Sequence, residues 1–146
     1  MIKMKDKPNQ YKYLPHTADA KFQSFGKTLE EAFRNAFLAT VAIVIDPESI
    51  KHNIEKPIEI KTNTKEALLY DFLEEIIFYL ESENIIFGDV KDIKIEKVEN
   101  KYKITAILVG DNDDDYEIAG NIKAITYSDM FIKEEDKVTI QVVIDL

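Results

Sequence analysis

Apolar residues recur at two different spacings along the chain, and these spacings divide it into helices and strands. A helical spacing begins after Thr28, which can cap the helix together with Glu31 three residues later. We expect Asp46-Pro47 to end this helix. Its predicted buried face comprises Leu29, Phe33, Ala36, Phe37, Thr40, Val41 and Val44.

A second helical pattern follows Asn63 or Thr64 and runs from Lys65 to about Glu83. Its predicted apolar side comprises Leu69, Phe72, Leu73, Ile76, Ile77 and Leu80. Glutamates occupy the other positions, where they can form a solvated face or a surface on which a basic partner docks.

Alternation at period two predicts strands elsewhere. One strand leads up to Pro15, and the others are expected at about 20–25, 58–62, 93–96, 102–109, 122–132 and 138–144. Many strands with two helices inserted early indicate a single α+β domain whose largely antiparallel or mixed sheets are covered by the two helices. We expect residues 1–10 to be a flexible N-terminal lead-in and residues 11–146 to form the domain.

The composition argues against several kinds of catalytic site, metal site and binding partner. The chain has no cysteine, so thiol chemistry is excluded, and its two histidines, His16 and His52, argue against a multi-histidine metal site within one chain. Any bound metal would have oxygen ligands, which favours calcium, magnesium or manganese. A net charge of −9 without a segregated basic patch argues against stable direct nucleic-acid binding and suits a basic protein partner. Without a membrane-spanning segment or a secretory signal, the protein is expected in the cytoplasm.

Two acidic residues at strand ends are candidate ligands. Asp19 follows His16 and stands just before a strand, while Asp145 and Leu146 follow the last strand. If those two strands are neighbours, two carboxylates and the oxygens of Leu146 converge, and a cation between them would relieve the repulsion. Calcium fits such a set best, because it accepts carboxylate, carbonyl and water oxygens in relaxed geometry. On residue type alone, both aspartates could equally be solvated.

The acidic run from Asp111 to Glu117 is a weaker metal candidate. Asp111, Asp113 and Asp115 have the spacing of a calcium loop, but Tyr116 replaces the required glycine and Ile122 the required glutamate. A solvated acidic loop is the better interpretation.

Three blocks in order resemble the archease family: 13–19 (YLPHTAD), 26–33 (GKTLEEAF) and 122–127 (IKAITY), followed by a closing strand that ends in Asp145. The resemblance implies that Asp19 and Asp145 bind a metal and are needed for activity. We expect Leu146 at the end of the chain to take part as well, and His16, which matches the motif, to support the turn. Ser128 stands where the family usually has histidine, which puts in doubt any role for an imidazole there. Lys123 and Tyr127 could face a partner, or Tyr127 could be half-packed on the core.

The resemblance also implies a function. Archeases activate the tRNA-splicing RNA ligase, accelerating its metal-dependent guanylylation and multiple turnover and widening its nucleotide use, without chemistry of their own. One alternative is a general chaperone or modulator of RNA-modifying enzymes such as a tRNA methyltransferase. Another is a stand-alone metal-dependent hydrolase, which is disfavoured because the sequence has neither a glycine-rich phosphate loop nor a nucleophile elbow.

Overall fold

The computed structural model describes residues 4–15 and 19–146. The order of its elements along the chain is β1 (Tyr11–Leu14), β2 (Ala20–Gly26), α1 (Leu29–Val41), β3 (Ile54–Thr62), α2 (Lys65–Glu83), β4 (Ile85–Val98), β5 (Lys101–Asn112), β6 (Ala124–Glu134) and β7 (Val138–Asp145). This is an α+β domain, as the sequence predicts. In the described part of the chain, no helix is long and apolar enough to cross a bilayer.

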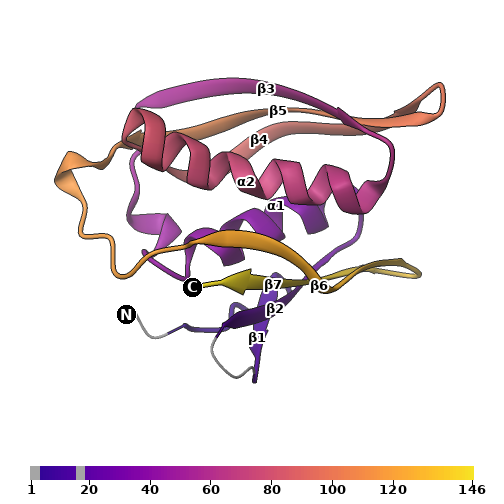
Figure 1. The fold of residues 1–146 in the computed structure, drawn as a ribbon, viewed down its shortest axis with the longest axis horizontal. Helices are drawn as coiled ribbons and strands as arrows, with labels where there is room; N and C mark the ends of the chain where they lie inside the picture. Colours follow the sequence, from indigo (N-terminus) through magenta and orange to yellow (C-terminus); the bar gives the residue numbers. More distant parts are fainter. Residues whose placement is uncertain (1–3, 16–18) are drawn as a thin grey trace.

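The strands form two antiparallel sheets with the helices between them (Figure 1). The first sheet has the order β1-β2-β7-β6 and the second β3-β5-β4. Helix α1 contacts β2 and β7 of one sheet and β4 of the other, while α2 contacts β6 on one side and β3 and β4 on the other. Each sheet therefore buries one face against the same pair of helices, and a single core forms between the two sheets.

Helix α1 begins as predicted but ends earlier. The Thr28 side chain caps it by accepting a hydrogen bond of 3.1 Å from the backbone N–H of Glu31. The helix stops at Val41, before the predicted stop at Asp46-Pro47, which was wrong by several residues. β-Branched residues at 41 and 43–45 disfavour further helix, and the carbonyl of Val44 instead accepts the N–H of Ala119 at 2.8 Å.

Helix α2 has the predicted bounds. Its cap is Thr64, whose hydroxyl accepts the N–H of Ala67 at 3.0 Å, and Asn84 ends it with φ of 56°. Phe72 is fully buried and its ring lies 5.7 Å from that of Phe33 and 5.3 Å from that of Phe37. This aromatic cluster joins the two helices at the centre of the core.

Strand boundaries differ from the sequence expectation mainly in length. Strand β3 starts at Ile54 rather than Ile58 and includes Pro57, which an edge strand tolerates because its missing N–H removes no hydrogen bond inside the sheet. Strand β6 starts at Ala124 rather than Ile122. The predicted hairpin is present as β4 and β5.

The described residues of the N-terminal lead-in contact the domain. Met4 packs against the core, Lys7 and Tyr11 exchange backbone hydrogen bonds of 3.0 Å, and the N–H of Tyr13 donates to Asp6 at 2.9 Å. The flexibility of residues 1–10 as a whole stays a prediction.

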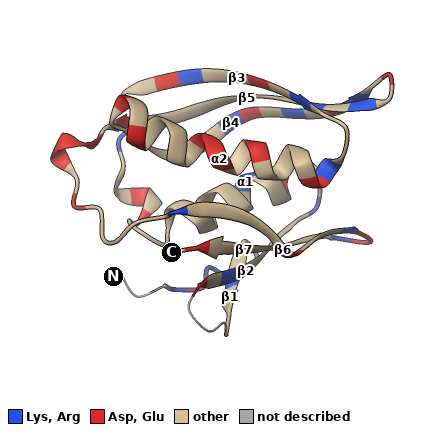
Figure 2. Cartoon of the chain, viewed as in Figure 1, with Lys and Arg blue, Asp and Glu red and all other residues tan. Residues whose placement is uncertain are grey.

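Acidic residues recur along α2 (Figure 2), at positions that are exposed or half-buried. Burial raises the pKa of Glu75 above its ordinary value, and the charges of Asp71 and Glu74 raise it further. The folded state therefore binds a proton at Glu75 more readily than the unfolded state does, and this lowers stability as pH rises above the ordinary pKa.

We expect Glu75→Gln to stabilise the protein by about 0.3 kcal/mol at pH 7, because it removes like-charge neighbours on one helix face. The gain should shrink as the pH falls through about 4 and vanish at about pH 3, where the glutamate is protonated in both folded and unfolded states. Urea denaturation at the two pH values measures this difference. Glu117→Gln, which removes an exposed carboxylate outside α2, is the control. An equal gain in both variants would mean that net charge, rather than the helix face, sets the effect.

Candidate functional site

The sheet register places Asp19 and Asp145 at the same end of two neighbouring strands. Strands β2 and β7 are antiparallel, and Ala20 pairs with Ile144. Asp19 directly precedes Ala20, and Asp145 directly follows Ile144 as the last residue of β7. Residues 126 positions apart in the chain thus meet at one rim of the sheet.

Asp145 is held by its main chain on the other side of β7. It pairs with Ala124, and its carbonyl oxygen accepts the N–H of Lys123 at 2.9 Å. Ile144 is fully buried, so strand alternation directs the Asp145 side chain to the opposite, half-buried face. The Asp145 carboxylate is therefore the candidate cation ligand on this face.

Leu146 packs its half-buried side chain against the core. Because this packing fixes Leu146, the main-chain oxygens of Leu146 stay near the rim that carries Asp145. His16, the predicted supporting residue, lies outside the described residues.

The donor set fits a hard cation. Within the described ranges, no three His, Cys, Asp or Glu side chains form a metal-binding group. The ligands of a cation at this rim would therefore be the carboxylates of Asp19 and Asp145, main-chain oxygens such as those of Leu146, and water. Such an all-oxygen set suits Ca²⁺ or Mg²⁺ rather than a metal that prefers nitrogen or sulfur.

A polar network on the same face of the sheet was not predicted. The Gln23 amide donates to Gln141 at 3.0 Å, and Gln141 donates to the carbonyl of Asp129 at 2.8 Å. The Asp129 carboxylate lies 3.4 Å from the Lys21 ammonium. Asp129 sits in an irregularity of β6 between Thr126 and Phe131, with φ of 53°. The network ties β2, β7 and β6 together beside the rim that carries Asp145. The sequence signal for it was a glutamine in each of the two strands, Gln23 in β2 and Gln141 in β7.

Tyr127 lies on the surface rather than against the core. Its side chain is 55% exposed, and its ring stacks on that of Tyr70 at 4.4 Å with an interplanar angle of 11°. The interpretation that Tyr127 is half-packed on the core was wrong, because its ring stacks on Tyr70 of α2 at the surface instead. Ser128 and Lys123 are also exposed, and the Ser128 N–H donates to Thr126 at 3.3 Å. Partner contact by Tyr127 and Lys123 stays a prediction.

The acidic run forms local hydrogen bonds instead of a calcium loop. Tyr116 donates its hydroxyl to Asp111 at 2.8 Å and accepts the N–H of Lys51 at 2.9 Å. The bond from Tyr116 lowers the pKa of the Asp111 carboxyl below its ordinary value. Asp113–Asp115 form a short 3₁₀ turn capped by Asn112. Tyr116, the residue that departs from the calcium-loop sequence, thus joins this loop to the backbone of Lys51.

Comparison with known proteins identifies similar chains over nearly the whole length. The profile of the Archease protein family (MTH1598/TM1083) matches residues 11–146. Protein archease of Methanosarcina barkeri is 38% identical over 98% of this chain and 100% of its own length. Protein archease of Thermococcus kodakarensis is 37% identical over 86% of this chain and 89% of its own. The solution structure of Methanobacterium thermoautotrophicum protein 1598 has a TM-score of 0.80 and 28% identity, covering 94% of this chain and 99% of that one.

Proposed function

Because this chain belongs to the archease family, we propose that it activates the tRNA-splicing RNA ligase rather than catalysing a reaction itself. It accelerates the metal-dependent guanylylation of the ligase and its return to the active state between turnovers. It also widens the nucleotides that the ligase accepts. The observation that carries this proposal is the meeting of Asp19 and Asp145 at one rim of the sheet.

The rim is the part of the protein that acts on the ligase. Asp19 and Asp145 bind a divalent cation, with calcium as the first choice, and main-chain oxygens of Leu146 complete the set. When bound, such a cation would supply positive charge to a phosphate-bearing pocket of the ligase. The protein's own contribution is position: β2 and β7 hold the two carboxylates together, and the Lys123–Asp145 backbone bond keeps the end of β7 in the sheet.

Activation requires that the protein bind one ligase conformation better than another. A partner that binds both conformations equally shifts nothing, however tightly it binds. The anionic rim therefore has to complement the ligase state that is ready for guanylylation. A net charge of −9 favours docking on a basic enzyme surface and disfavours binding to the RNA itself.

The direct test combines the purified protein with the RNA ligase of the same organism. We expect the rate of single-turnover guanylylation to rise, and ligase present below the RNA concentration to complete several rounds instead of one. Metal-stripped protein is the control for the cation. If both rates are unchanged while a tRNA methyltransferase is stimulated, the alternative role as a modulator of RNA-modifying enzymes replaces this proposal.

A further inference from the structure

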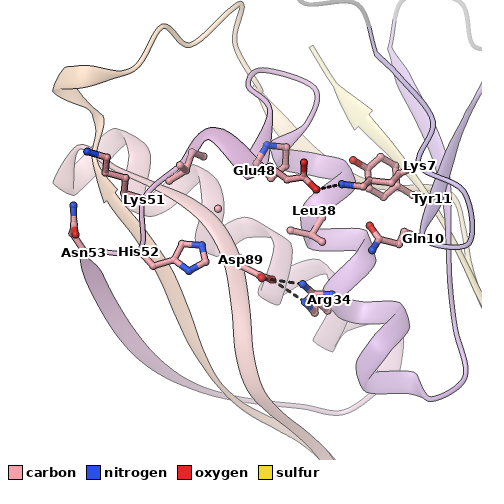
Figure 3. A pocket seen from close by; sticks show the side chains of 13 residues that line it. Lys7, Gln10, Tyr11, Arg34, Leu38, Glu48, Lys51, His52, Asn53 and Asp89 are labelled. Atoms are coloured by element: carbon pink, nitrogen blue, oxygen red, sulfur yellow. Dashed lines mark hydrogen bonds and ion pairs between the residues drawn. The ribbon is translucent and has the colours of Figure 1, made fainter.

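A cavity of about 600 Å³ lies between α1, β4, the start of β1 and the segment around residues 47–53 (Figure 3). Its volume is within the range of small-molecule sites. Gly88 of β4 allows the wall to form, because a Cβ there would lie 2.9 Å from both the Pro47 carbonyl oxygen and the Ile50 side chain. The cavity shares no lining residue with the Asp19–Asp145 rim.

An oriented guanidinium lies in this cavity. Arg34 Nε donates to Asp89 Oδ1 at 2.8 Å, and Arg34 Nη2 donates to Asp89 Oδ2 at 2.9 Å. Asp89 is itself fixed by the N–H of Val90, which donates to it at 2.7 Å. A guanidinium has more N–H donors than these two bonds use, so Nη1 can still bind a second anion. Asp89 thus fixes the orientation of the Arg34 guanidinium and leaves some of its N–H donors available.

The lining is locally cationic on an acidic protein. Three of the residues that line the cavity are basic (Lys7, Arg34 and Lys51) and two are acidic (Glu48 and Asp89), and Lys7 forms an ion pair with Glu48. The lining residues therefore carry one excess positive charge before any protonation of His52, whereas the whole chain has a net charge of −9. A concave, partly apolar wall focuses such a field on its interior.

His52 supplies a second polar group to the same cavity. Figure 3 shows its ring on the Asp89 side of the cavity, while Lys51 and Asn53 lie on the far rim. Within the described part of the chain, the imidazole makes no hydrogen bond. Leu38 and Ile50 supply an apolar wall beside these polar groups.

We propose that this cavity binds a small organic phosphate, with its oxyanion on Arg34 and His52 and its uncharged body against Leu38 and Ile50. A phosphate fits better than a carboxylate, because it has more acceptor oxygens for the remaining Arg34 donors and the imidazole. This cavity is separate from the Asp19–Asp145 rim that we propose acts on the ligase. If phosphate does not bind in the cavity, the proposed activation of the ligase is unaffected.

The test is a two-dimensional NMR titration with phenyl phosphate as the probe, inorganic phosphate as the head alone and benzoate as the matched carboxylate. We expect the amide signals of Gly88, Asp89 and residues 50–53 to shift, and phenyl phosphate to bind several-fold more tightly than either other probe. Arg34→Lys keeps the charge but loses the fork, and should weaken binding roughly tenfold. His52→Ala, on an exposed position that leaves the Arg34–Asp89 pair intact, should also weaken it.

Lys27→Gln removes one positive charge from an exposed position outside the cavity, and is the control for general electrostatic attraction. Three results would overturn the proposal: no shift at millimolar phenyl phosphate, equal binding of benzoate, or an equal loss in Lys27→Gln and His52→Ala.

Discussion

Asp145→Asn and Asp19→Asn are each expected to lower ligase activation by roughly tenfold or more, since weakening a metal site through one group commonly costs this much. Asparagine keeps the size of the side chain but removes the negative charge. The backbone pairing of Ala20 with Ile144 and of Ala124 with Asp145 needs neither carboxylate, so the fold should persist.

Single-turnover guanylylation of the cognate ligase measures the loss of activation, and titration calorimetry with Ca²⁺ measures the accompanying loss of cation binding. Both readouts should fall together if the carboxylates act through a cation. The matched control is Asp136→Asn, an exposed aspartate just before the other end of β7. Full activation by both rim variants would reject the role assigned to Asp19 and Asp145, while leaving the family membership unaffected.

Phe72→Ala should destabilise the protein by about 3–5 kcal/mol, the range found when a buried aromatic side chain is truncated. Phe72 is fully buried and packs on Phe33 and Phe37 of α1. The loss would open a cavity where both helices meet between the sheets, so the surrounding side chains can relax only partly. This is a large fraction of the stability of an ordinary domain.

Phe78→Ala on the same helix is the control for this prediction. The Phe78 side chain is 53% exposed, so its truncation should change stability by no more than about 0.5 kcal/mol. Urea denaturation of the two variants gives the comparison directly. Similar losses in both would mean that the helix propensity of α2, rather than its buried contacts, limits stability.

Helices could be predicted well from the sequence because their signals are local. Thr28 and Thr64 accept hydrogen bonds from N–H groups three residues away, so residues within a single turn determine where each helix starts. The end of α1 could not be predicted in this way. The turn that follows it is held in part by a bond from the N–H of Ala119, 75 positions further along the chain, to the Val44 carbonyl.

The candidate site was predicted only in part. Resemblance to a family singled out Asp19 and Asp145, yet no local pattern shows that β2 and β7 are neighbours. The Gln23–Gln141 bond and the Arg34–Asp89 fork were missed altogether, because their partners are 118 and 55 residues apart. Each of these residues taken alone resembles an ordinary surface or edge position.

The sequence by itself determined the type of each main element, the caps of both helices and the exclusion of thiol sites. Periodicity, capping and composition act within a few residues or over the chain as a whole, so they can be read without coordinates. The tertiary structure alone decided which strands are neighbours and in which register, and thus which charges meet at the rim and in the cavity. The physical reason is that register follows from burying whole strand faces against both helices at once, a choice that no single segment contains.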